Sequence, residues 1–289
     1  MSETSEISLR VTSERSLAEE WALVLVSEGF SPRVRPADEG FVLSVPTEEA
    51  QQSHVFLSAY ENENAKPQQR EEPTAAADAH TGLGVSAALL AFFLVTGPRN
   101  PTVLWFERGT ADAERILQGE PWRTVTALTL HADGAHVLSN AAAGAIFLSA
   151  VCGTLGPGLG CALALLAGAV GNLLTALFHG SSHVSVGAST SVFGAVGVLG
   201  GVGVLRRRRI GVRGRRTWVP IAASLALLAM LGTGPRADLW AHLYGLLVGI
   251  VLGISIALTV PHPPGFRAQC VLGGLTAAAI IYCWMIALN

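Results

Sequence analysis

The sequence predicts a polytopic α-helical membrane protein that begins with a small α+β domain. Half of the 289 residues are hydrophobic and only 14% are charged, a composition that ordinary soluble domains do not have. The bias is uneven, because charged residues are frequent up to about residue 78 and rare afterwards. Long apolar segments then follow one another to the end of the chain.

Residues 1–65 have the charge balance of a soluble domain, and residues 66–79 are a polar, Pro-containing linker. The domain carries no cluster of residues that indicates catalysis, so binding an unknown partner, regulating access and stabilising the protein all remain open as its role. The hydrophobic pattern predicts strand, helix, strand, strand and helix in that order. The expected ranges are 7–11, 16–30, 32–37, 40–46 and 47–63.

Residues 80–289 are predicted to form a membrane domain of seven transmembrane helices. Each apolar segment has about the ~20 residues that a helix needs to cross a ~30 Å hydrocarbon layer, although the first and fifth are short. The segments are 81–97, 134–153, 157–178, 186–205, 217–233, 239–260 and 268–288.

The loop between the fourth and fifth segments predicts the orientation in the bilayer. Residues 206–216 contain seven arginines, and short arginine-rich loops stay in the cytoplasm. The N-terminal domain is then cytoplasmic, and residues 99–133 lie outside. A topology signal explains this loop better than a nucleic-acid partner does. The N-terminus has no apolar signal and no organelle-targeting pattern, which favours a bacterial inner membrane.

Four polar residues stand in these apolar stretches: Ser189, His242, His136 and Asn140. Polar groups are costly in hydrocarbon, so they indicate a functional site. The predicted orientation places His136, Ser189 and His242 near the outer ends of the second, fourth and sixth helices. Residues far apart in sequence would therefore share one depth in the outer leaflet.

These residue types fit nucleophilic catalysis. A serine hydroxyl needs a base to accept its proton, and His242 is the candidate base for Ser189. His136 and Asn140 are four residues apart, so one helix face carries two hydrogen-bond donors for an oxyanion. No carboxylate is available within the spans to orient His242, which predicts a dyad. Gly187 would let the backbone approach closely beside the serine.

At these residues the chain resembles the rhomboid family of intramembrane serine proteases. The likeness covers about residues 80–260. It rests on four motifs in the family's order: Trp122-Arg123; His131, His136 and Asn140; Gly187-Ala188-Ser189-Thr190; and Ala241-His242 with Gly245 and Gly249.

The resemblance implies a six-helix bundle with a seventh helix at the C-terminus. It also implies a serine endopeptidase that cleaves single-span transmembrane substrates near the outer face, in the lipid bilayer, without a cofactor or metal. His131 would support the outer loop or the water supply, and a polar cavity would be lined partly by His179, Ser181, Ser182, His183 and Ser185.

Two positions depart from the family pattern. Thr190 stands where many members have glycine, and Phe193 where many have a tyrosine packed against the histidine. Phe193 can still stack on His242, so an active enzyme is expected.

Two other function classes remain as alternatives. A catalytically inactive rhomboid-like binding protein would share the fold. A secondary transporter would use His136, Asn140 and His242 as a substrate or proton path near the midplane, and the expected outer-leaflet depth argues against it.

Overall fold

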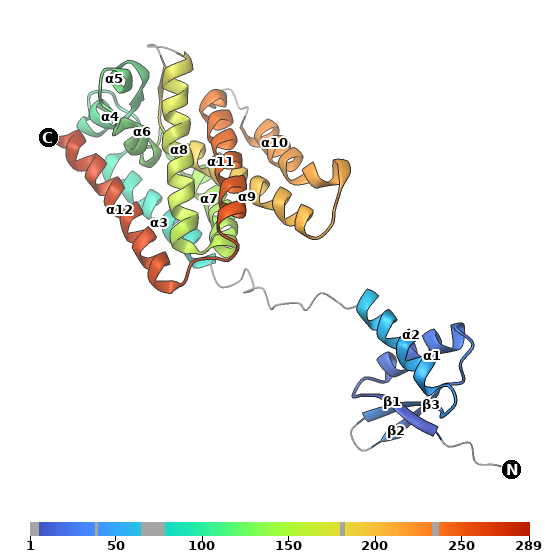
Figure 1. The fold of residues 1–289 in the computed structure, drawn as a ribbon. Helices are drawn as coiled ribbons and strands as arrows, with labels where there is room; N and C mark the ends of the chain where they lie inside the picture. The colour runs from blue at the N-terminus through green and yellow to red at the C-terminus, as the bar shows by residue number, and fades with distance from the viewer. Residues whose placement is uncertain (1–5, 38–39, 65–78, 180–182, 233–236) are drawn as a thin grey trace. The chain divides into compact units, whose positions relative to one another are not determined.

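A computed structural model describes residues 6–37, 40–64, 79–179, 183–232 and 237–289. The chain divides into two compact units, Met1–Glu72 and Pro73–Asn289, which are described separately (Figure 1). The predicted linker at 66–79 lies outside the described residues, except for Ala79, where the first helix of the second unit begins.

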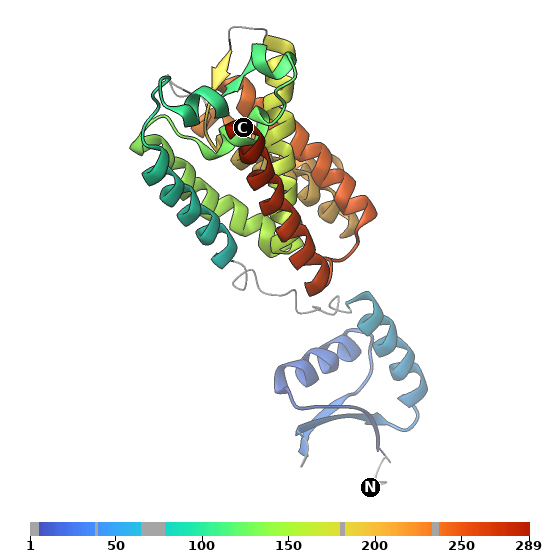
Figure 2. The ribbon, with the colours of Figure 1, turned by 90° about the vertical axis from the view of Figure 1, so that its left-hand side faces the viewer.

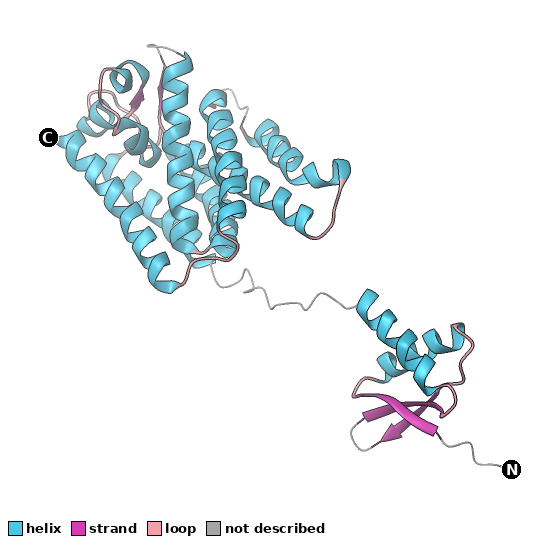
Figure 3. Cartoon of the chain, in the orientation of Figure 1, coloured by secondary structure: helices cyan, strands magenta, loops and turns pink. Residues whose placement is uncertain are grey.

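The first unit is an α+β fold with the predicted order of elements (Figure 3). Its three strands form an antiparallel sheet in the order β1-β3-β2, and Trp21, Leu25 and Leu57 from the helices pack with Leu43 and Val45 of the central strand. The elements are β1 Glu6–Thr12, α1 Arg15–Ser27, β2 Arg33–Ala37, β3 Gly40–Pro46 and α2 Ala50–Glu63.

The second unit is a helical bundle, and the prediction of a polytopic α-helical membrane protein is confirmed. Among the described residues, five helices are long and apolar enough to cross a membrane, whereas α3 and α10 are shorter. Only 11% of the most apolar stretch of α12 is buried within the chain, which leaves its surface for lipid. The helices are α3 Ala79–Thr96, α7 Gly134–Leu155, α8 Pro157–His179, α9 Ser189–Arg209, α10 Val219–Leu231, α11 Leu239–Thr259 and α12 Phe266–Leu288.

Glycines bring α9 and α11 into backbone contact. A Cβ added at Gly249 would lie 2.1 Å from the carbonyl oxygen of Gly194, and one at Gly197 would lie 2.2 Å from that of Leu246. Side chains at these positions would force the helices apart, whereas glycine permits the close packing typical of membrane helices.

The last helix is fastened to the bundle by one buried amide. Gln269 Nε2 donates to the carbonyl oxygen of Leu155 at 2.8 Å, and its Oε1 accepts the N–H of Leu159 at 2.9 Å. The side chain therefore satisfies backbone groups at the α7–α8 junction that have no intrahelical partner. From this anchor α12 runs along the outside of the bundle (Figure 2).

The segment between α3 and α7 is folded over one end of the bundle. Its short elements are held together by Arg123, which is fully buried and donates to the carbonyl oxygen of Thr110 at 3.1 Å. The two-residue strand β4 (Ala111–Asp112) pairs antiparallel with β5 (Val184–Ser185), so this segment contacts the chain just before α9. Its helices are α4 Leu104–Gly109, α5 Ala113–Leu117, α6 Arg123–Thr126 and η2 Ala127–Thr129.

Candidate active site

Ser189 and His242 meet at the N-terminal ends of α9 and α11. The Oγ of Ser189, the first residue of α9, lies 2.7 Å from Nε2 of His242, the fourth residue of α11. The carboxylate of Asp238 caps α11 by accepting the N–H of Ala241 at 3.1 Å, which fixes where the helix begins. The close packing of α9 against α11 then brings the hydroxyl to the imidazole.

The other nitrogen of His242 determines what Nε2 can do. Nδ1 lies 3.2 Å from the carbonyl oxygen of Gly232, and a carbonyl oxygen only accepts hydrogen bonds. Nδ1 therefore carries the ring proton, and the lone pair of Nε2 is directed at the hydroxyl of Ser189. The ring of Phe193 covers His242 with the centroids 4.8 Å apart, which restricts the imidazole to this orientation.

His136 and Asn140 present two hydrogen-bond donors beside Ser189. The backbone N–H of Ala132 donates to Nδ1 of His136 at 3.3 Å, so Nε2 of that ring carries its proton. Asn140 is buried, and its Nδ2 has no hydrogen-bond partner within the described residues. A buried donor without an acceptor is unfavourable and leaves a position for a group that arrives during a reaction.

Gly187 opens the space into which these donors point. Its φ of +132° is one that side chains rarely permit, and a Cβ there would lie 2.7 Å from Nε2 of His136 and 3.4 Å from Nδ2 of Asn140. Its own N–H donates to the carbonyl oxygen of Ala127 at 2.9 Å. The glycine therefore leaves room for a small oxygen between the two donors and Ser189.

His131 supports this turn from behind. The ring is fully buried, and its Nε2 accepts the N–H of Ala188 at 3.4 Å. Burial, with the neighbouring His136, lowers the pKa of His131 to about 4. The imidazole therefore stays neutral at ordinary pH, as a hydrogen-bond acceptor must. Its bond to the N–H of Ala188 fixes the backbone immediately before Ser189.

A family model for the rhomboid domain matches residues 118–258. That range contains the serine, the three histidines and the asparagine described above. The chain belongs to the rhomboid family.

Similar rhomboid-family proteins occur in bacteria and plants. YdcA of Bacillus subtilis is 29% identical over 59% of this chain and 83% of its own length. RHOMBOID-like protein 6, mitochondrial, of Arabidopsis thaliana is 31% identical over 56% of this chain and 52% of its own length. Rhomboid protease GluP of Bacillus subtilis is 28% identical over 62% of this chain and 35% of its own length. The last two are thus matched over only about half of their length or less.

Two further residues of the rhomboid motifs lie away from the reacting atoms. Trp122 precedes α6, and Arg123 stabilises the segment between α3 and α7 through Thr110 and an ion pair with Glu120. Neither is placed in contact with Ser189 or His242. They position the segment that covers this end of the rhomboid bundle.

Gly245 and Thr190 explain how this rhomboid accommodates a threonine after its serine. A Cβ at Gly245 would lie 2.3 Å from the carbonyl oxygen of Thr190, and the threonine methyl group packs between Gly171 and Gly245. The larger side chain is therefore accommodated in the α8–α9–α11 packing and not in the site.

The residues expected to line a polar cavity have separate partners. Nε2 of His183 lies 2.7 Å from Oδ2 of Asp238, and the ring of His179 packs on Trp240 with the centroids 4.6 Å apart. Ser185 lies in β5, whereas Ser181 and Ser182 lie outside the described residues.

Sequence reasoning missed the carbonyl of Gly232 and the carboxylate of Asp238. A backbone carbonyl has no sequence signal, so the partner of His242 Nδ1 could not be predicted from the sequence. Asp238 precedes an apolar helix, where an acidic cap is expected, but nothing in the sequence pairs it with His183.

Proposed function

We propose that this rhomboid-family chain is an intramembrane serine endopeptidase that cleaves transmembrane segments of single-span membrane proteins. One observation carries the proposal: Ser189 Oγ lies 2.7 Å from a His242 nitrogen that must be unprotonated, because the other ring nitrogen is bound to Gly232. This is the arrangement that a serine nucleophile requires of its general base.

In the first step, Ser189 Oγ attacks the carbonyl carbon of the substrate peptide bond while His242 Nε2 accepts the hydroxyl proton. The negative charge that develops on the carbonyl oxygen is stabilised by Nε2–H of His136, Nδ2–H of Asn140 and the backbone N–H of Ser189. The amide comes from the N-terminus of α9, where free N–H groups and the helix dipole favour negative charge.

In the second step, the imidazolium of His242 gives its proton to the leaving amine nitrogen, and the C–N bond breaks. Water then attacks the acyl ester on Ser189, and His242 accepts a proton from it. The ester bond breaks, the proton returns to Ser189 Oγ, and the carboxylate product leaves. Gly232 holds the imidazole in the correct tautomer through both steps, a role that a carboxylate has in serine proteases with a triad.

The orientation of the chain also belongs to this proposal. Ser189 and the arginines from 206 to 209 lie at opposite ends of α9. If the arginine end lies in the cytoplasm, the serine is near the outer face, and the N-terminal domain is cytoplasmic. A bacterial inner membrane fits this arrangement.

The alternatives lack the specific support that the protease has. An inactive rhomboid-like binding protein gains nothing from a free donor on Asn140 beside an activated hydroxyl. A secondary transporter is expected to bind its substrate near the midplane, whereas Ser189, His242 and His136 all lie in the first turns of their helices.

The test is cleavage of model transmembrane substrates by the purified full-length chain in proteoliposomes. Wild type is expected to cleave and to be labelled by a fluorophosphonate, while Ser189→Ala and His242→Ala do neither. Ser191→Ala, which removes a hydroxyl two residues further along the same helix, should retain both activities. Failure of wild type to cleave any substrate or to take the label would overturn the proposal.

A further inference from the structure

The membrane unit carries its carboxylates at one end of the bundle and its largest excess of arginines at the other. After Asp78 the chain has six carboxylates, five of them in residues 107–133 and the sixth at Asp238, all at the end that carries Ser189. The seven arginines of residues 206–216 lie at the other end, in the last turn of α9 and the loop that leads to α10, together called the α9–α10 connection. Some of these arginines line a pocket, and within the described residues none of those forms an ion pair.

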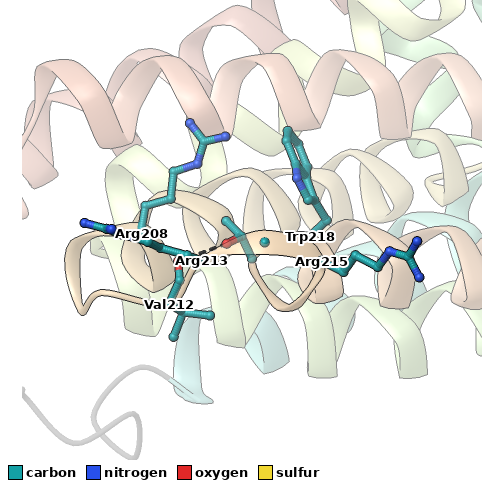
Figure 4. A pocket seen from close by; sticks show the side chains of 7 residues that line it. Arg208, Val212, Arg213, Arg215 and Trp218 are labelled. Carbon is teal, nitrogen blue, oxygen red and sulfur yellow. Dashed lines mark hydrogen bonds between the residues drawn. The ribbon is translucent and has the colours of Figure 1, made fainter.

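This connection borders an open surface pocket of about 600 Å³, a volume within the range of small-ligand sites. Figure 4 shows Arg208, Arg213, Arg215 and Trp218 around it. The guanidinium carbon of Arg208 lies 5.4 Å from the centroid of the Trp218 ring, a cation–π distance that holds the charge over the pocket.

Other arginines of the connection form its frame. Nη1 of Arg207 donates to the carbonyl oxygen of Arg216 at 3.2 Å, and Arg209 donates to the carbonyl oxygen of Ala257 in α11. The hydroxyl of Thr217 donates to the carbonyl oxygen of Val212 at 2.9 Å and closes the turn. Hydrogen bonds within the loop thus fix its backbone, while the side chains of Arg208 and Arg215 extend in different directions from it (Figure 4) and make no ion pair with a described residue.

Trp218 lines the pocket and is 49% exposed. Ile210 and Val219, which follow α9 and begin α10, are not lining residues but are also exposed, at 73% and 46%. Tryptophan prefers the interfacial depth of a membrane, and arginine stems extend along lipid while their charges reach the headgroups. An anion bound here would have hydrocarbon beside it.

We propose that this pocket binds the phosphate of an anionic phospholipid headgroup, such as phosphatidylglycerol. Guanidinium groups bind phosphate oxygens through paired N–H donors, and basic pockets at the ends of transmembrane helices recognise such headgroups. The acyl chains lie along α9 and α10 beside Ile210 and Val219. Free inorganic phosphate carries a similar negative charge, but it has no acyl chain to contact the exposed apolar side chains beside the pocket.

The test is lipid binding to the purified full-length chain in neutral detergent, measured by native mass spectrometry. The probe is phosphatidylglycerol, with phosphatidylcholine of the same chains as the comparison. The pocket variant is Arg208→Gln with Arg213→Gln and Arg215→Gln. The matched variant, Arg206→Gln with Arg209→Gln and Arg216→Gln, removes the same charge from arginines that do not line the pocket.

We expect phosphatidylglycerol to bind in preference to phosphatidylcholine, and the pocket variant to weaken that binding at least about tenfold, more than the matched variant does. Equal losses in the two variants, or equal binding of the two lipids, would overturn the proposal. Displacement of the lipid by excess inorganic phosphate would assign the pocket to free phosphate and overturn the proposal that it binds a lipid. If the triple variant does not fold, Arg208→Gln and Trp218→Leu are measured singly, and unchanged binding in both contradicts the site.

Discussion

Nε2 of His183 lies 2.7 Å from Oδ2 of Asp238, and this contact ties the loop before α9 to the cap of α11. His183 also accepts the N–H of Ala113 through its carbonyl oxygen at 2.9 Å. One residue therefore joins the segment between α3 and α7 to the helices that carry Ser189 and His242.

This pair predicts a stability that depends on pH. The hydrogen bond to Asp238 raises the pKa of His183, against a smaller opposing effect of burial. Burial alone would raise the pKa of Asp238, but the hydrogen bonds from His183 and Ala241 outweigh it and lower that pKa. The pair is charged between the two folded-state pKa values. Its stabilisation is fully present below the unfolded pKa of histidine, about 6.5, and is lost as pH rises through the raised pKa of His183.

At the acid end, the stabilisation is lost again as pH falls through the lowered pKa of Asp238. Between pH 6 and pH 9, the melting temperature of wild type should therefore fall by about 1–3 °C more than that of His183→Gln. The difference is small because a partly exposed pair contributes about 1 kcal/mol at most. Both proteins also carry His179→Gln, which removes the ring whose centroid lies 6.2 Å from that of His183. His54→Gln, an exposed histidine of the first unit, should leave the difference unchanged. An equal pH dependence in wild type and His183→Gln would contradict the prediction.

Gly187→Ala is expected to abolish most of the activity. The methyl group would lie 2.7 Å from Nε2 of His136, at a φ of +132° that alanine rarely adopts, so it would occupy the position of the oxyanion. We expect a loss of about 10²-fold or more in the cleavage rate. Gly84→Ala, whose methyl group meets nothing within 4 Å, is the control, and equal rates for the two variants would refute the assignment of this space.

Asn140→Ala should lower kcat by about 10²–10³-fold with little change in KM, because the amide contacts the oxygen only when it carries charge. Ser139→Ala changes an exposed neighbour on the same helix and should have no effect. Steady-state kinetics with a fluorogenic transmembrane substrate measure both constants. A rise in KM at constant kcat would instead place Asn140 in ground-state binding.

Phe193→Tyr is expected to destabilise the protein, although tyrosine is common at this position in the family. Cζ of Phe193 lies 3.2 Å from the position of a Cβ at Gly232, so a hydroxyl on Cζ has no space beside the turn that binds His242. Overpacking of this kind typically lowers the free energy of unfolding by about 1–3 kcal/mol. Thermal unfolding measures the change, and Phe266→Tyr, at an exposed ring, serves as the control.

The positions of the helices could be predicted because hydropathy reports burial in lipid, but their ends depend on local backbone chemistry. The fourth apolar segment was expected at 186–205, whereas α9 covers Ser189–Arg209. Gly187 has a φ that no helix contains, so the helix begins after it. The arginines extend its other end, where positive charge is favourable.

The candidate site was predictable as a set of residue types and not as a set of contacts. Periodicity placed His136 with Asn140, and the order of the spans brought Ser189 near His242. The carbonyl of Gly232 and the pairing of β4 with β5 depend on loop conformations far apart in sequence. Two-residue strands carry no periodic signal of their own.

The backbone contact between α9 and α11 limits how this chemistry can change. Only glycine hydrogens separate the helices near Gly249 and Gly194, so no side chain there can be exchanged to shift the hydroxyl relative to the imidazole. The distance between Ser189 and His242 is thus a property of two main chains. Evolution of rate or selectivity in such a protein has to act through the surroundings of the pair, such as the ring at Phe193 or the turn at Gly232.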